Sequence, residues 1–424
     1  MADRLAALSA GLAELGCEAL LVVARTGQDP DLAPFVGAAH LGECQLVALR
    51  DGPAHLAYLT PMERDEAAST GLSLLTPEAL DLTRWASEAP EPAEHMARVA
   101  RKALQLAGVV PGRLALAGHG QAGVIVAACN HLVKEGWTIV PGNPLVLAVR
   151  KRKTAAELAS LRAAAAATCT AMRRVAELLS AAVPRGDKDT KDNKDDRDSK
   201  DDGALWLAGE ALTVARLREE VSRVFAGHGL EQPKGNIIAP AEEGGVPHST
   251  GTPDRVLCAG ESLIVDLFPH GPMWADCTRT FCVGTPPEPL ARAWAAVRDA
   301  LETAYLRVAP GARGWDIQET ICALFDQRGY PTPISSPGTT AGYVHNLGHG
   351  VGFDLHEPPI FKKSSGAEGV LREGDVFTLE PGLYDPTPGT GYGVRLEDLM
   401  WLGPEGPESL TALPYEMDPR GWAA

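Results

Sequence analysis

The sequence predicts an α/β domain at residues 1–147 followed by an α+β domain at residues 148–424 whose antiparallel strands form a curved sheet. Helix-like and strand-like apolar patterns alternate through the first part of the chain. After about residue 206, two pairs of short apolar strands each follow or precede helix-like segments, which gives a weak internal pseudo-twofold repeat. A chain of 424 residues is long enough to bury two cores of this kind.

The first domain is predicted to open with a helix, because leucines recur at helical spacing between residues 5 and 15. Asp51-Gly52 between two apolar runs predicts a β-hairpin. We find no catalytic constellation in this domain, and its histidines are expected to be isolated structural or surface side chains. The predicted strands are residues 19–23, 44–49, 55–59, 114–117 and 137–140, and the histidines are His40, His55, His95, His119 and His131.

The second domain is predicted to begin with a long alanine-rich helix. Thr154 and Glu157 have the spacing of a capping box, and the helical pattern continues to about Ala182. The basic run at residues 150–153 before it is expected to be a solvated face or a set of ion-pair partners rather than a nucleic-acid patch. The next stretch, residues 185–203, is expected to be a mobile charged loop because no apolar residue interrupts its acidic and basic residues from 187 to 202. A calcium loop there lacks the required glycine.

Helices are predicted at residues 212–225, 289–308 and 315–327, and two hairpins at residues 262–283 and 375–402. These hairpins and the segment between them carry acidic side chains and one imidazole in apolar contexts, where an unpaired charge is costly to bury. The set consists of Asp266, Asp276, His349, Glu380 and Glu397. A hard, oxygen-rich set of this size suits two divalent cations about 3.5–4 Å apart, with Mn²⁺ favoured and Zn²⁺ or Co²⁺ accommodated. Hydrolysis by a metal-activated water is therefore the leading hypothesis.

Further candidate catalytic residues lie in the same third of the chain. His248, His345 and His356 are predicted to contact a substrate or its transition state, and Arg395 is predicted to orient a metal-bridging carboxylate. The run from His345 to His349 has the spacing of the helical zinc motif only, because Asn346 replaces the glutamate base.

Composition excludes several classes of function. The formal charge of −16 argues against nucleic acid or an anionic membrane as a partner. No apolar run has the length of a membrane span, and the eight scattered cysteines are expected to be reduced, buried side chains. Cytoplasmic localisation is the expectation.

The motifs of the second domain resemble the catalytic domain of the pita-bread metallopeptidases, which include methionine aminopeptidase, aminopeptidase P, prolidase and creatinase. The resemblance covers residues from about 150 to 415. The motifs that carry it are Val265-Asp266, Ala275-Asp276-Cys277-Thr278-Arg279-Thr280-Phe281, His349-Gly350-Val351-Gly352 with His356-Glu357, Leu379-Glu380-Pro381-Gly382 and Val394-Arg395-Leu396-Glu397-Asp398. The α/β domain in front resembles the creatinase-like N-terminal domain of the Xaa-Pro-cleaving branch.

The resemblance implies a dinuclear metallopeptidase with a pita-bread fold. In it, Asp276 and Glu397 bridge the metals, Asp266 completes one metal's shell, and His349 and Glu380 complete the other's. Glu380 also shuttles protons, and a metal-bridging hydroxide attacks the bond between an N-terminal residue and a following proline. Peptide substrates with proline second and a homodimer are further expectations.

The sequence leaves aminopeptidase P and prolidase (Xaa-Pro dipeptidase) activities open. Two other functions also remain as alternatives: a creatinase-like hydrolase that uses the fold without metals, and a binding protein on the same scaffold that has lost catalysis. The presence of all five ligand types argues against both.

Overall fold

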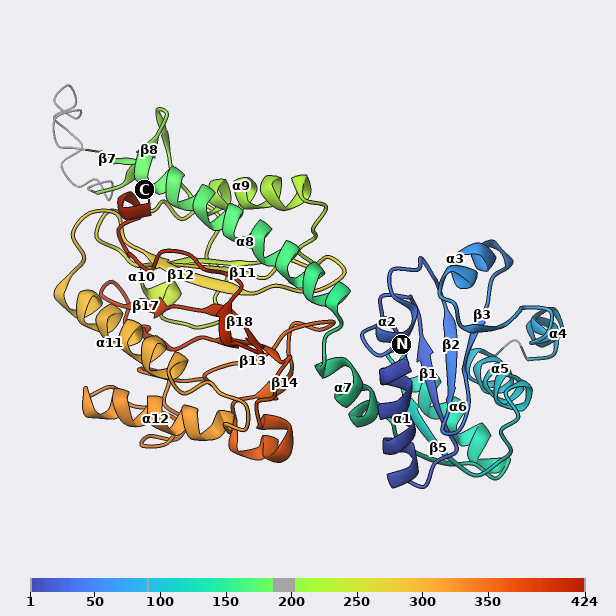
Figure 1. The fold of residues 1–424 in the computed structure, drawn as a ribbon. Coiled ribbons are helices and arrows are strands. Elements are labelled where there is room, and N and C mark those ends of the chain that lie inside the picture. The colour runs from blue at the N-terminus through green and yellow to red at the C-terminus, as the bar shows by residue number, and fades with distance from the viewer. Residues whose placement is uncertain (1, 90, 186–202, 423–424) are drawn as a thin grey trace. The chain divides into compact units, whose positions relative to one another are not determined.

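The computed structural model describes residues 2–89, 91–185 and 203–422, which belong to two compact units, Met1–Arg152 and Lys153–Ala424 (Figure 1). The boundary predicted between residues 147 and 148 falls inside helix α7 (Asn143–Lys151), which the sequence patterns did not reveal. Most of the Asp/Lys-rich stretch that we predict to be mobile, residues 186–202, lies outside the described residues.

The first unit is built on a mixed sheet in the order β4-β3-β2-β1-β5-β6. Strand β1 pairs antiparallel with β2 and parallel with β5, and β2 pairs with β3 as the hairpin predicted around Asp51-Gly52. The elements are α1 (Ala2–Glu14), β1 (Ala19–Ala24), α2 (Ala33–Val36), β2 (Cys44–Leu49), β3 (Ala54–Tyr58), α3 (Arg64–Ser69), β4 (Ser73–Leu75), α4 (Leu82–Glu88), α5 (Pro92–Leu106), β5 (Arg113–Ala117), α6 (Ala122–Lys134), β6 (Thr138–Pro141) and α7.

Two apolar layers cover this sheet. Leu8 and Leu12 of α1 pack with Leu20 on one face, together with residues of α7. On the other face, Leu21 lies in a cluster with Leu104 of α5 and residues of α6. Neighbouring residues of β1 thus point to opposite faces, and both faces are covered, which explains why this strand is an unbroken apolar run.

The second unit begins with α8 (Ala155–Ala181), and the predicted capping box is confirmed because Thr154 and Glu157 each accept a bond from the other's backbone N–H. The short strands β7 (Val183–Pro184), β8 (Leu205–Leu207) and β9 (Glu210–Ala211) follow. The remaining elements are α9 (Val214–Gly227), β10 (Ile237–Pro240), α10 (Ala241–Gly244), β11 (Leu263–Leu267), β12 (Cys277–Phe281), α11 (Glu288–Tyr305), α12 (Gly314–Gln327), β13 (His349–Gly350), β14 (Glu357–Ile360), β15 (Val376–Leu379), β16 (Gly382–Asp385), β17 (Tyr392–Arg395), β18 (Asp398–Gly403) and β19 (Gly406–Ser409).

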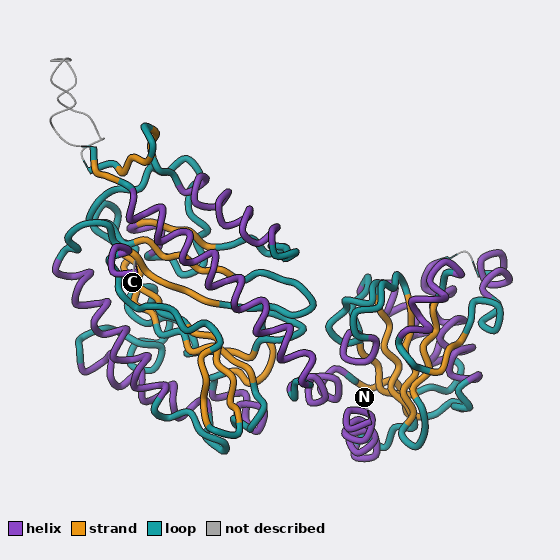
Figure 2. The backbone as a smooth tube through the Cα atoms, turned by 45° about the horizontal axis from the view of Figure 1, so that its top comes forward, coloured by secondary structure: helices purple, strands orange, loops and turns teal. Residues whose placement is uncertain are grey.

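The strands of this unit lie between two pairs of helices. Helices α8 and α9 pack on β11 and β12, whereas α11 and α12 pack on the strands from β15 to β18 (Figure 1). Figure 2 shows the same arrangement from a second direction, with strands between the helices of this unit. The two helix-and-hairpin halves predicted from the sequence therefore enclose one antiparallel centre.

The state of the cysteines and the apolar length of the helices are both visible in this fold. All eight cysteines are free thiols, as expected, but only five of them are buried, because Cys129, Cys169 and Cys258 are partly exposed. Within the described part of the chain, no helix is long and apolar enough to cross a membrane.

Candidate metal centre

Two hairpins position the acidic residues. In the first, β11 and β12 are antiparallel, so that Asp266 lies opposite Thr278, and Asp276 stands immediately before β12. The apolar neighbours of Asp266 on β11 are buried on both sides of the sheet, which fixes the strand and leaves the carboxylate facing the interior.

The second hairpin is interrupted where its acids stand. Its outer part pairs β15 with β18 and its inner part pairs β16 with β17, leaving Glu380-Pro381 and Leu396-Glu397 between the two ladders. Pro381 has no N–H to donate, so the ladder cannot continue through it. The backbone N–H of Glu397 bonds instead to the carbonyl of Thr278 on β12, at 3.0 Å. This interruption brings Glu397 against the first hairpin.

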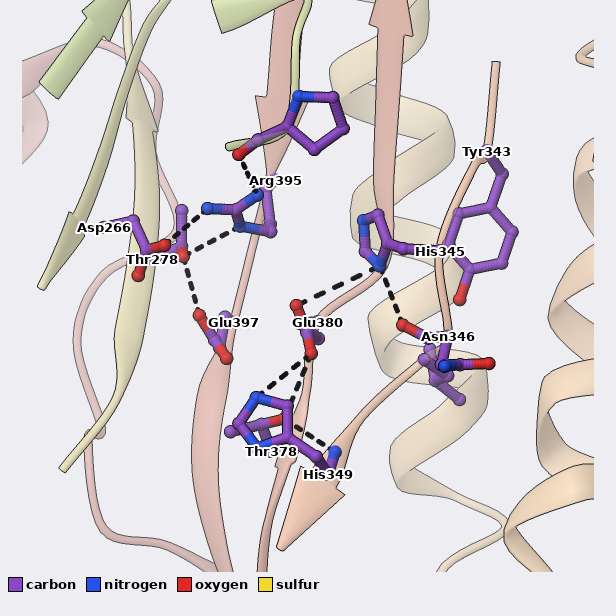
Figure 3. Close-up of polar contacts among 12 residues, drawn as sticks. Asp266, Thr278, Tyr343, His345, Asn346, His349, Thr378, Glu380, Arg395 and Glu397 are labelled. Carbon is purple, nitrogen blue, oxygen red and sulfur yellow. Dashed lines mark hydrogen bonds and ion pairs between the residues drawn. The ribbon is translucent and has the colours of Figure 1, made fainter. Parts of the chain in front are cut away.

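The acids converge on His349. Its Nε2 lies 3.4 Å from Oε1 of Glu380 and 3.7 Å from Oδ2 of Asp276. One ligand atom each from Asp276, His349 and Glu397 lie within 4.8 Å of one another. Figure 3 shows Glu380 and Glu397 side by side above His349, with Asp266 beyond Glu397.

The hydrogen bonds of His349 orient it as a ligand. Its Nδ1 lies 3.1 Å from the carbonyl oxygen of Gly350, which requires a proton on Nδ1 and leaves the Nε2 lone pair directed at the acids. Burial lowers the pKa of His349 to about 3, with a further contribution from His356, so the ring is neutral at ordinary pH. A neutral imidazole held in this way is the usual form of a metal-binding histidine.

The carboxylate oxygens fit divalent metal ions. Oδ1 of Asp266, Oδ1 of Asp276 and Oε1 of Glu397 are buried and have no hydrogen-bond partner among the described residues. Buried oxygens without donors are rare in folded proteins because each loses its hydration without replacement. Oxygen atoms together with one imidazole nitrogen are the donors that Mn²⁺, Co²⁺ and Zn²⁺ accept. These residues therefore suit a pair of such ions.

The electrostatics of the site indicate the same requirement. Burial first, and then repulsion from Glu397, Asp266 and Glu380, raises the pKa of Asp276 well above its usual range. Burial and the charge of Glu380 likewise raise the pKa of Glu397, and burial raises that of Glu380 to about 8. Carboxyl groups this close cannot all ionise without added positive charge.

Arg395 connects the acids through hydrogen bonds. It donates from Nη2 to Oδ2 of Asp266 at 2.6 Å and from Nε to the hydroxyl of Thr278 at 3.0 Å. Thr278 in turn donates to Oε2 of Glu397 at 2.6 Å. Arg395 thus touches Asp266 directly and acts on Glu397 through Thr278 (Figure 3). Sequence reasoning missed Thr278, although its position two residues after Asp276, at the start of β12, favours the same face for both side chains.

Tyr384 extends this network to His345. Its hydroxyl accepts a bond from Nη1 of Arg395 at 3.0 Å and lies 2.8 Å from Nε2 of His345. Nδ1 of His345 is 2.7 Å from the carbonyl of Asn346. Both ring nitrogens of His345 therefore have partners within the protein, although the sequence predicts that this residue contacts substrate.

The other two candidate histidines are exposed at the same centre. The ring of His356 lies 4.3 Å from that of His349, in an edge-to-face arrangement. The charge of His248 contributes to lowering the pKa of both His345 and His356, after the larger effect of burial. His248 and His356 are thus accessible to a molecule that approaches the acids.

A second group of potential ligands lies in the first unit, where the sequence predicted isolated histidines. His119 is not isolated, because its Nδ1 lies 3.0 Å from Asp29. Both carboxylates in the group are already bonded: Asp29 accepts from the N–H groups of Asp31 and His119, and Asp31 accepts from Gly118, Asn143 and Arg150. This group has the structure of a loop anchor, with its oxygens satisfied by donors.

The metal-free protein is expected to lose stability as pH rises from about 5 to 8. Glu380 has an ordinary pKa of 4.5 but about 8 when folded, so in this window the folded state holds a proton that the unfolded state releases. The expected loss is roughly 1 kcal/mol or more. Urea unfolding of chelated protein at several pH values measures it. Glu380→Gln should weaken the dependence without abolishing it, because the pKa values of Asp276 and Glu397 are raised as well. Constant stability of the parent protein across this window would contradict the expectation.

Solved structures resemble the whole chain. The prolidase from Pyrococcus horikoshii OT3 aligns over 98% of this chain and 99% of its own, with a TM-score of 0.72 and 20% identity. A variant of aminopeptidase P from Escherichia coli aligns over 99% of this chain and 96% of its own, with a TM-score of 0.69 and 18% identity. At these identities the likeness establishes the fold, which is the predicted pita-bread fold with its N-terminal α/β domain.

Curated relatives match by sequence over a shorter segment. An Xaa-Pro dipeptidase from Pyrococcus furiosus is 30% identical over 225 residues, which is 51% of this chain and 60% of the relative. The probable dipeptidase PepE of Mycobacterium tuberculosis is 29% identical over 207 residues, 48% of this chain and 51% of the relative. The match thus spans only about half to three fifths of each relative's length. Residues 159–404, more than half of the chain, match metallopeptidase family M24, and this segment contains the acids, His349 and Arg395 described above. This chain belongs to metallopeptidase family M24.

Proposed function

We propose that the protein is a dinuclear metallopeptidase that hydrolyses the bond between an N-terminal residue and a following proline. The observation that carries the proposal is the group of buried, unpartnered oxygens of Asp266, Asp276 and Glu397 beside the neutral ring of His349. Such an arrangement has little value for stability and is suited to holding cations. The names of the relatives, Xaa-Pro dipeptidase and prolidase, support the choice of substrate.

Asp266, Asp276, His349, Glu380 and Glu397 would together hold two divalent ions per subunit. Manganese is the favoured metal because oxygen donors predominate. When bound, the ions acidify a water molecule and polarise the scissile carbonyl. The proposal is compatible with zinc or cobalt in place of manganese.

The protein's own side chains supply orientation and proton transfer. Glu380 contacts His349 and lies 4.0 Å from Nδ1 of His345, so its carboxyl group is placed to take up a proton and pass it on. His248 and His356 are exposed at the same centre. His356 is neutral because burial lowers its pKa, so it offers an N–H to a carbonyl or carboxylate of the peptide. Arg395 holds Asp266 and, through Thr278, Glu397 in fixed orientations.

The substrate proposal is tested by comparing Ala-Pro and Ala-Pro-Ala with the matched peptides Ala-Ala and Ala-Ala-Ala. Chelated protein is reloaded with Mn²⁺, Co²⁺ or Zn²⁺, and release of alanine is measured. We expect that only the proline peptides are cleaved, and that the rate is greatest with Mn²⁺. A preference for Ala-Pro identifies a dipeptidase, and a preference for Ala-Pro-Ala identifies an aminopeptidase. Asp276→Ala should abolish release.

Other outcomes would select a different function. If metal-loaded protein leaves both proline peptides intact, the substrate proposal is wrong. Hydrolysis that survives exhaustive chelation favours a creatinase-like reaction, and calorimetry without any metal binding favours a binding protein. Sedimentation of the same preparation tests the proposed homodimer.

Tyr384→Phe is expected to lower kcat/KM about 10- to 100-fold. The substitution removes only the hydroxyl that joins Arg395 to His345, and partners of this kind typically contribute that much to a metal site. Tyr305→Phe is the matched control, because that hydroxyl bonds to the carbonyl of Pro407 outside the site. Equal activity of the two variants would contradict the proposed role of Tyr384.

A further inference from the structure

The first unit contains a cavity of about 380 Å³ that is separate from the metal centre. It lies where β1 and β3 end and β2 begins, under α5 and beside the start of α6. Its volume is in the range of pockets for small organic ligands, and α/β sheets commonly bind ligands beyond the carboxyl ends of their parallel strands. Its lining is mostly apolar, with Val23, Leu59, Met96 and Val99 among the contributors.

Gln45 on β2 is the unusual member of the lining. It stands between Val23 and Ala57 in the sheet, on the face that packs against α5 and α6, and it is only 3% exposed. Its Oε1 is buried and accepts no hydrogen bond from the described residues. A buried amide oxygen without a donor is costly, and an apolar residue at this position would avoid the cost. Gln45 therefore indicates a ligand that brings the donor.

A second part of the lining favours an anion. Gly120 and Gln121 line the cavity at the start of α6. This helix has thirteen residues, and no side chain caps its N-terminus. Free N–H groups and the helix dipole there attract negative charge. Arg25 lies in the same lining, with its Nε 3.8 Å from Glu43 in an exposed ion pair of the weak surface kind. A carboxylate that binds here could replace Glu43 as the ion-pair partner of Arg25 at little cost.

We propose that this cavity binds a small carboxylic acid with an apolar body and a neutral hydrogen-bond donor at its far end. The donor, an O–H or N–H group, bonds to Oε1 of Gln45. The carboxylate lies at the start of α6 near Arg25. A charged ammonium at Gln45 is disfavoured because the surrounding side chains there are apolar. The proposal concerns the first unit alone and does not depend on the peptidase function.

Calorimetric titration of the full-length protein tests this with three related probes. They are 4-hydroxyphenylacetate, phenylacetate, which lacks the donor, and 4-methylphenol, which lacks the carboxylate. We expect 4-hydroxyphenylacetate to bind about tenfold more tightly than either of the others, the difference that one hydrogen bond or one charge contact provides. Absence of binding by all three, or equal binding, would overturn the proposal.

Variants identify the site of binding. Gln45→Met keeps the length of the side chain but removes the amide, so 4-hydroxyphenylacetate should lose its advantage over phenylacetate. Ala86→Trp, at the exposed part of the lining, should block all binding. Gln105→Met on the exposed side of α5 is the matched control and should bind as the parent does. Unchanged preference for 4-hydroxyphenylacetate in Gln45→Met contradicts the assignment.

A melting experiment separates binding from a structural role of Gln45. Without ligand, Gln45→Met should melt at a higher temperature than the parent, because it removes a buried acceptor that has no donor. A lower melting temperature, together with unchanged probe binding, would show that Gln45 serves the fold.

Discussion

Asp276→Asn is expected to lower kcat/KM for the proline peptides about a thousandfold. Asparagine has nearly the size of aspartate but lacks the charge that balances the metal ions. Metal ions stabilise the transition state by several kcal/mol, and each 1.4 kcal/mol corresponds to a factor of ten in rate. Because the substitution removes charge repulsion among buried acids, the metal-free variant should be at least as stable as the parent.

Steady-state assays with saturating Mn²⁺ and thermal melting with and without chelator measure both effects. Asp299→Asn provides the control, since that carboxylate is half exposed on α11 and pairs with Arg328 rather than with a residue of the site. Retention of more than a tenth of the parent activity in Asp276→Asn would mean that this residue is not a metal ligand.

Arg279→Met is expected to destabilise the second unit by about 3–5 kcal/mol. Arg279 is 1% exposed and donates to Asp398 at 2.7 Å and to the backbone carbonyl of Glu397 at 2.6 Å. Tyr415 also donates to Asp398. Removing the guanidinium leaves the carboxylate of Asp398 buried without its cation, which is the costly way to break a buried pair.

Urea unfolding of the metal-free protein measures this loss. The double variant Arg279→Met with Asp398→Leu should recover much of the stability, because neither charge then remains buried alone. Arg298→Met, at an exposed i,i+4 pair with Glu302, should change stability by less than about 0.5 kcal/mol. A loss as small as that in Arg279→Met would show that Arg279 is not essential to the support of Glu397.

Local patterns predicted α1 and five strands of the first unit, and the four long helices α8, α9, α11 and α12 of the second, but they did not predict α2 to α6. The box of Thr154 and Glu157 located the start of α8 within a residue, because capping depends on neighbours in the chain. Helix α9 begins at Val214 rather than at Leu212, since Thr213 caps it and the preceding residues form β9. Helix α7 was missed because residues 145–149 form an unbroken apolar run without helical spacing and its basic end resembles a linker. Within that basic run, Arg150 and Lys153 are buried in ion pairs with Asp31 and Glu357, as the ion-pair alternative anticipated.

The sequence by itself determined the chemical kinds of side chain at the centre, because acids in short apolar strands demand compensation wherever the strands lie. Only the tertiary structure decided which atoms meet. Thr278 joins Arg395, 117 residues away in the chain, to Glu397, 119 residues away. His345 bonds to Tyr384 within the protein. Likewise, no local pattern marks Gln45 as a polar group facing a cavity. Spacing along a strand specifies a face, but partners on that face come from distant segments whose packing sets the final distances.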